Sequence, residues 1–166
     1  MMQKIKTALH EDYLRSLMFG LQDGIVSTTG VVVGISTGVN NKEIVVLAAL
    51  VAVTVEASSM AAGQYSSEKA VHQKSGKHTD SLFIGALIMF VAYMLGGALP
   101  IIPTVIFDQA TARVLAVVSA FIGLFIIGYI KGHIVEHKPI RSAVELFIIG
   151  AIATAIGVIV GNLLKV

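Results

Sequence analysis

The sequence contains no cysteine and little charge. Of its 166 residues, 13% are charged and 55% are hydrophobic, whereas a soluble domain of this size carries about 25% charged residues. Without cysteine, neither a disulfide framework nor a thiolate metal site can form. The net charge of +2 is too small and too dispersed to indicate nucleic-acid binding. The apolar residues gather in long runs, which indicates an integral membrane protein.

The first twenty residues also lack the continuous apolar stretch of a cleaved signal peptide, and they carry Glu11 and Asp12 in their middle. Apolar residues recur every four positions from Ile5 to Leu17, which gives one apolar stripe on a helix. We therefore expect residues 1–19 to form an amphipathic interfacial helix. The alternative is a frayed polar tail.

Apolar runs of about 20 residues predict membrane-spanning helices. The sequence shows no internal repeat and no connection long enough to form a separate domain. We therefore predict an all-α integral membrane protein, in which residues 1–166 form a single five-helix transmembrane domain. The predicted spans are residues 20–39, 44–65, 82–105, 112–131 and 142–164.

Lysine and arginine are distributed unequally between the two sides of these spans. One side carries nine of them: Lys4, Lys6, Arg15, Lys69, Lys74, Lys77, Lys131, Lys138 and Arg141. The other side carries three: Lys42, Arg113 and Lys165. Because cytoplasmic loops are enriched in lysine and arginine, we expect a cytoplasmic N-terminus and an external C-terminus.

Two carboxylates lie inside the predicted spans at similar depths. The first span ends near Val39, and Asp23 lies about 24 Å from that end at 1.5 Å per residue. The second span runs back from Ile44, which places Glu56 about 18 Å and Met60 about 24 Å from the same end. Glu56 and Met60 also share a helix face, because they are four residues apart. These three side chains are expected to lie at one level in the cytoplasmic half of the membrane.

An unpaired carboxylate in hydrocarbon is costly, so it normally faces a partner or a water-filled path. No basic residue lies in the spans at this depth, which favours a mobile cation or a proton as the partner. The thioether of Met60 would tilt an oxygen site toward Fe²⁺ and its first-row neighbours. The alternatives are a protonated Glu56 hydrogen-bonded across a helix interface, Asp23 capping a helix start, and Met60 as packing.

Glycines in the first span support close packing or a path. Gly30, Gly34 and Gly38 are spaced by four residues, and such a face permits close helix approach or leaves room for an ion near the backbone. In the third span, two glycines (96 and 97) and two prolines (100 and 103) predict a bend or an unwound end.

With these residues in view, the sequence resembles the vacuolar iron transporter family. "RSLMFGLQDGIVSTTGVVVGI" is similar to the first-helix signature of that family, and "VEASSMAAGQYSSEK" to its second-helix signature. "MLGGALPIIP" and "FIIGYIKG" resemble the third and fourth helices. The resemblance covers nearly the whole chain.

The resemblance implies a homodimer with its ion path between subunits along the first helices. It implies proton-coupled export of Fe²⁺, with Mn²⁺, and an ion site made of Asp23, Glu56 and Met60 from both subunits. The metal would be the transported substrate, and no cofactor is expected. Known members extend the second helix into a cytosolic domain rich in glutamate. Here residues 65–80 form only a short linker, in which Glu68 is the single glutamate.

A second pattern, "HIVEH" at residues 133–137, matches the H-x-x-E-H motif of zinc peptidases. His133 and His137 would share a helix face, but the motif precedes Pro139, where a helix is expected to end, and no third ligand is evident. The alternatives are a weak cytosolic metal patch, with His72 and His78, or solvated loop histidines.

The sequence therefore predicts a divalent-metal transporter and no enzyme. Metal and proton compete for the same carboxylate oxygens, which suits proton antiport. The alternatives are a passive divalent-cation channel and an intramembrane zinc peptidase that uses His133, Glu136 and His137. We expect a prokaryotic cell membrane, with an organellar (vacuolar) membrane as the alternative.

Overall fold

All of the regular structure in the described part of the chain is helical. The computed structural model describes residues 2–75, 81–136 and 138–165. The elements are α1 (Met2–Gly38), α2 (Lys42–Ser75), α3 (Leu82–Ile106), α4 (Gln109–Lys131), a π-helical turn η1 (Gly132–Glu136) and α5 (Pro139–Leu163).

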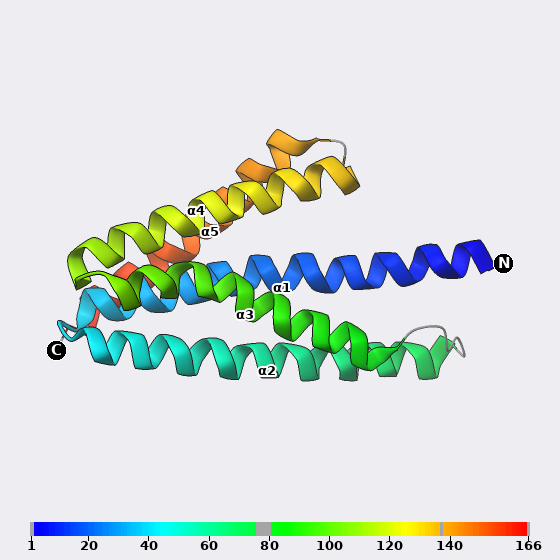
Figure 1. Ribbon diagram of the computed structural model, residues 1–166, viewed down its shortest axis with the longest axis horizontal. Helices are drawn as coiled ribbons and strands as arrows, with labels where there is room; N and C mark the ends of the chain where they lie inside the picture. The colour runs from blue at the N-terminus through cyan, green and yellow to red at the C-terminus, as the bar shows by residue number, and fades with distance from the viewer. Residues whose placement is uncertain (1, 76–80, 137, 166) are drawn as a thin grey trace.

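The long helices alternate in direction along one axis of an elongated bundle (Figure 1). The start of α1 lies at one end, together with the end of α2, the start of α3 and η1, and the end of α5 lies at the other end (Figure 1). Five helices of the described residues are long and apolar enough to cross a membrane. The predicted all-α fold with five spans is confirmed.

Two helices are longer than the predicted segments. The amphipathic helix and the first span form one uninterrupted helix, α1. The predicted linker after residue 65 is wrong for its first ten residues, because α2 continues through Ser75. Residues 64–75, "QYSSEKAVHQKS", follow the apolar run. They include good helix formers and neither glycine nor proline.

Helix α1 is the centre of the bundle, since it contacts each of the other four long helices. The buried side chains are mostly small or β-branched, such as Val32, Ala49, Val53, Ala57 and Ala116. Large apolar side chains instead lie on the outer surface along all four helices from α2 to α5. This inside-out distribution is what a protein surrounded by lipid tails requires, because lipid solvates apolar side chains as well as a core does.

Polar side chains before three helices account for where those helices begin. The amide of Ile44 donates to Asn41 Oδ1 at 2.9 Å, just before α2. Ser81 caps α3, and Asp108 caps α4 by accepting from the Thr111 amide at 3.1 Å. That hydrogen bond favours the charged form and lowers the pKa of Asp108.

The last turn of α1 is held by side chains of α4. Gln109 Nε2 donates to the carbonyls of Ser36 at 3.1 Å and Val39 at 2.6 Å. Arg113 donates to the hydroxyl of Ser36 at 3.1 Å and also to its carbonyl. These donors satisfy carbonyls that lack partners at a helix C-terminus, and the guanidinium complements the helix dipole.

Helix α3 stays helical through Pro100 and Pro103 and is bent along its length in Figure 1. Of the two alternatives predicted for this region, the unwound end is wrong. Pro103 cannot donate to Leu99, four residues earlier. Ser119 Oγ of α4 donates to that carbonyl instead, at 3.1 Å, so the proline is tolerated inside the bundle.

Residues 133–136 of the "HIVEH" motif lie within η1, and the Lys138 amide donates to the Gly132 carbonyl at 3.1 Å. His133 is exposed. The placement of His137 and His78 and the side chain of Glu136 lie outside the described part of the structure. A metal patch at His133 and His137 therefore stays a prediction.

Candidate functional site

The carboxylate of Glu56 lies where α1, α2 and α3 meet. Ser27 Oγ of α1 donates to Glu56 Oε2 at 3.0 Å, and Tyr93 Oη of α3 donates to the same oxygen at 2.5 Å. The two hydroxyl groups also contact each other. One carboxylate oxygen thus collects two hydroxyl donors from two other helices.

Close packing of α1 on α3 brings these hydroxyls together. A Cβ atom on Gly24 would overlap the backbone of Tyr93, and one on Gly20 would lie 2.8 Å from the Met89 carbonyl. Only glycine permits this approach of two helix backbones. Tyr93, which is 1% exposed, therefore reaches past α1 to Glu56 on α2.

Asp23 lies one turn from Ser27 on α1. It is half-buried, and its carboxylate interacts electrostatically with that of Glu56. Among the described residues, the side chain of Asp23 makes no hydrogen bond or ion pair, and no lysine or arginine pairs with Glu56. Two carboxylates thus share a small region without a protein cation to balance them.

Met60 follows Glu56 by one turn of α2. It is partly buried and packs against the apolar cluster that includes Val53, Ala57 and Tyr93. Met60 therefore packs in the region where α1, α2 and α3 meet. This placement is compatible with packing and with metal ligation, so the role of Met60 stays a prediction.

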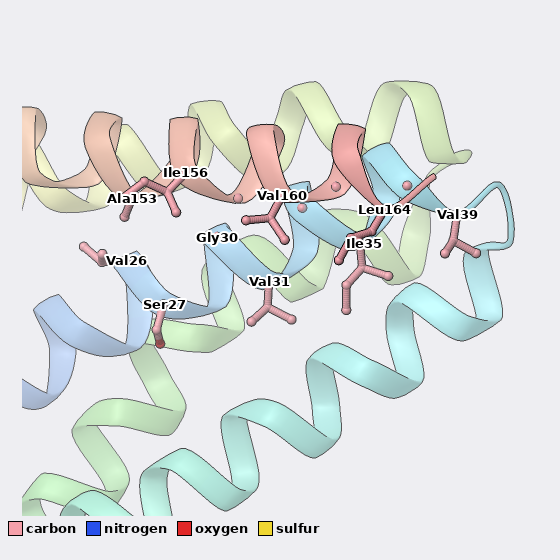
Figure 2. A pocket seen from close by; sticks show the side chains of 14 residues that line it. Val26, Ser27, Gly30, Val31, Ile35, Val39, Ala153, Ile156, Val160 and Leu164 are labelled. Carbon is pink, nitrogen blue, oxygen red and sulfur yellow. The ribbon is translucent and has the colours of Figure 1, made fainter. Parts of the chain in front are cut away.

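A groove between α1 and α5 leads to this region. It has a volume of about 540 Å³, and Ser27 is its polar side chain (Figure 2). Gly30, Gly34 and Gly38 lie along its floor. Figure 2 shows Ser27 at one end, with Val39 and Leu164 at the other. The groove thus runs from the end of α1 that α4 holds to the hydroxyl that contacts Glu56.

The glycines also pack against α5 of the same chain. A Cβ atom on Gly34 would lie 2.9 Å from the Gly157 carbonyl, and one on Gly38 would lie 2.8 Å from the Gly161 carbonyl. Gly30 has more space, with Ala153 O at 3.7 Å. Gly34 and Gly38 therefore lie close to the α5 backbone, and all three glycines line the groove. Their role, as packing or path-lining residues, stays a prediction.

A second polar cluster lies two to three turns further along α2. Gln64 Nε2 donates to Ser16 Oγ at 3.0 Å and to Glu68. Arg15 forms ion pairs with Glu68 at 3.1 Å and with Asp12 at 3.2 Å. Glu68 is thus paired with a cation, unlike Glu56.

Sequence reasoning missed Ser27 and Tyr93, the two hydroxyl donors to Glu56. A serine or tyrosine in an apolar helix is common and carries no signal of its own, so only the helix packing identifies these two. It also did not single out Glu145, an exposed acid in the second turn of α5. Among the described residues, no group of three histidine, cysteine or acidic side chains could hold a metal ion.

The amino-acid sequence of this chain is similar to those of known proteins over most of its length. The VIT family model matches residues 14–79 and 70–162. Vacuolar iron transporter 1 of Arabidopsis thaliana is 46% identical over 71 residues, which are 42% of this chain but only 28% of that transporter.

Two relatives align over a longer part. The uncharacterized protein MJ0645 of Methanocaldococcus jannaschii is 30% identical over 173 residues, which cover 92% of this chain and 90% of that protein. Vacuolar iron transporter homolog 4 of Arabidopsis thaliana is 26% identical over 158 residues, or 87% and 80% of the two chains. The family match across five membrane-spanning helices and the similarity to MJ0645 over nearly its full length establish that this chain belongs to the VIT family.

Proposed function

We propose that the chain is one subunit of a homodimeric transporter that moves Fe²⁺, and Mn²⁺ as well, out of the cytoplasm in exchange for protons. Asp23 and Glu56 hold the cation and take up the exchanged proton, and Met60 adds a soft ligand. Iron enters the proposal through the relatives, several of which are named vacuolar iron transporters.

The observation that carries this proposal is the environment of Glu56. Its carboxylate accepts from two hydroxyls and interacts electrostatically with a second acid, Asp23, and no described cation balances the pair. Inside a membrane such an arrangement is costly unless a mobile cation or proton neutralises it. A divalent ion does this best, because two carboxylates match its charge.

Proton exchange follows from the same chemistry. A carboxylate must be deprotonated to bind metal, so metal binding releases a proton and protonation releases the metal. The hydroxyls of Ser27 and Tyr93 can donate to Glu56 when it is charged. They also keep its oxygen pointed toward α1, where the groove begins.

A homodimer is supported by the shortage of ligands in one chain. One chain supplies two carboxylates and one thioether here, which is fewer than the six or so ligands that first-row divalent ions often take with oxygen donors. The groove along α1 and α5 is apolar and open, and a second copy along this face would bring a second set of ligands.

The sequence offered two alternatives to this proposal. A passive channel would use the same residues but would move no protons. The peptidase alternative is removed by the family assignment, because the VIT family consists of transporters and not enzymes.

Transport into proteoliposomes tests the proposal. The purified chain is reconstituted, Fe²⁺, Mn²⁺, Zn²⁺ and Mg²⁺ are compared, and a trapped dye reports the internal pH. We expect Fe²⁺ and Mn²⁺ uptake with a coupled pH change, and neither in vesicles that contain the Glu56→Gln variant. Metal uptake without a pH change would favour the channel, and no metal uptake would refute the proposal.

A further inference from the structure

A second cavity lies nearer the N-terminal end of α1 and shares no lining residue with the groove. It has a volume of about 500 Å³ and is lined by α1, the end of α4 and η1. Its lining includes Leu14, Arg15, Met18 and Phe19 of α1, with Lys131 of α4 and Val135 of η1. No part of the proposed transport mechanism uses it.

The two cationic side chains that line this cavity, Arg15 and Lys131, lie toward the end of the bundle where α1 begins. Arg15 is nearer the N-terminal end of α1 than Phe19, and Lys131 is the last residue of α4, which runs toward that same end. Lysine and arginine are concentrated at this end of the bundle, which is predicted to be cytoplasmic. The cavity therefore has a basic rim near the membrane surface.

Arg15 retains unused hydrogen-bond donors. Its side chain is 62% exposed, and both of its ion pairs, with Asp12 and Glu68, use Nη2. Among the described residues, Nε and Nη1 donate to no other group. A guanidinium with free donors at a membrane surface suits a phosphate group, which accepts hydrogen bonds in this geometry.

Away from this rim the lining is mostly apolar. Met18 and Phe19 of α1 follow Arg15, before the polar Gln22, and Leu14 and Val135 add apolar side chains beside the two cations. From Arg15 to Gln22, the last residue of α1 in the lining, the helix rises about 10 Å. An occupant with an anionic head and an apolar tail would satisfy both ends of this space.

A second copy of the chain fits this cavity poorly. A twofold contact brings the same surface of both copies together, so it would place two Arg15–Lys131 pairs close to each other. Free phosphate would leave the apolar part empty. An acidic phospholipid matches the charge of the rim and the apolar body at once, as basic pockets between transmembrane helices do for anionic lipids.

We propose that this cavity is a binding site for one anionic phospholipid, with its phosphate at Arg15 and Lys131 and an acyl chain along Met18 and Phe19. The phosphate would use the Nε and Nη1 donors of Arg15, while Nη2 keeps its ion pairs with Asp12 and Glu68.

Native mass spectrometry of the purified full chain, titrated with phosphatidylglycerol or phosphatidylcholine, tests this site. We expect preferential binding of phosphatidylglycerol. Lys131→Gln should weaken it about fivefold, the effect of one surface cation, and so should Arg15→Gln. Lys74→Gln is the matched control, because it removes one exposed cation at the same end outside the cavity.

The apolar part is tested separately. Val135→Trp should fill the cavity and reduce lipid binding, whereas Ile134→Trp, at a neighbouring and equally exposed position outside the lining, should not. Equal binding of the two lipids, or no effect of Lys131→Gln and Val135→Trp, would overturn the proposal. So would a loss of dimer in Val135→Trp with unchanged lipid binding, or displacement of the lipid by inorganic phosphate alone.

Discussion

Replacing Gly157 with alanine is expected to force α1 and α5 apart. A Cβ atom at this position would lie 2.5 Å from the Gly30 carbonyl oxygen, and 3.2 and 3.3 Å from the carbonyl carbon and Cα of the same residue. These are backbone atoms, so no side chain can rotate away. The helices must separate by nearly 1 Å to reach an ordinary contact of 3.4 Å.

The facing residue provides a matched control. A Cβ atom on Gly30 would have its nearest neighbour, the Ala153 carbonyl, at 3.7 Å, which is ordinary contact. Both substitutions gain the same helix propensity, about 1 kcal/mol relative to glycine. Only Gly157→Ala adds the cost of overpacking, typically about 1–3 kcal/mol. The two variants should therefore differ by about this amount, with Gly157→Ala the less stable.

Thermal unfolding in mild detergent, followed by far-ultraviolet circular dichroism, measures the difference. For a chain of this size, 1 kcal/mol corresponds to about 2–4 °C in Tm, so we expect a Tm difference of at least a few degrees. If Gly157→Ala were as stable as Gly30→Ala, the close contact of α1 and α5 described above would be incorrect.

Three further predictions concern the acids, the thioether and a helix cap. Asp23→Asn and Glu56→Gln should each abolish metal transport in proteoliposomes, because both remove the charge that a cation needs. Both keep side-chain size, so the circular dichroism spectrum should stay that of wild type. Normal Fe²⁺ transport by Glu56→Gln would refute the site. Met60→Leu should lower the Fe²⁺-to-Mn²⁺ ratio of transport efficiencies at fixed pH, because Mn²⁺ tolerates an all-oxygen site. An unchanged ratio, with a stability cost below about 1.5 kcal/mol, would reduce Met60 to packing. Asp108→Asn should be less stable than wild type at neutral pH. Because the pKa of Asp108 is lowered in the folded protein, the stability that its charge adds is present above the ordinary value of 3.8 and is lost as the pH falls through the folded value. The Tm difference between the two should therefore disappear in acid, and a difference that persisted would contradict the capping role.

The spans could be predicted from the sequence because lipid imposes a length and a composition on each helix. Hydropathy placed the end of α2 ten residues too early, because it reports where the apolar run ends and not where the backbone stops being helical. The residues after Tyr65 are polar yet continue the helix to Ser75. Helix propensity, and the absence of glycine between Tyr65 and position 76, would have predicted the longer helix.

The candidate site also combines residues that could be predicted from the sequence with residues that could not. Asp23 and Glu56 stand out in the sequence because a carboxylate is rare in an apolar run. Ser27 and Tyr93 do not, since their importance depends on the crossing of α1 and α3 and on the space left by Gly24. The stripe of Gly30 to Gly38 predicted close packing or a path but could not name α5 as the neighbour, because one small-residue face fits many partners.

The pairing of α1 with α5 also affects how the chain is made. Gly30 and Gly157 are in contact across the bundle but are separated by roughly 125 residues, which a ribosome adds at about 5–20 residues per second. For a time on the order of ten seconds, the first helix is in the membrane while its final neighbour has not been synthesised. During that time, lipid or the insertion machinery must cover the glycine face. Assembly of the bundle is therefore complete only when the last helix enters the membrane.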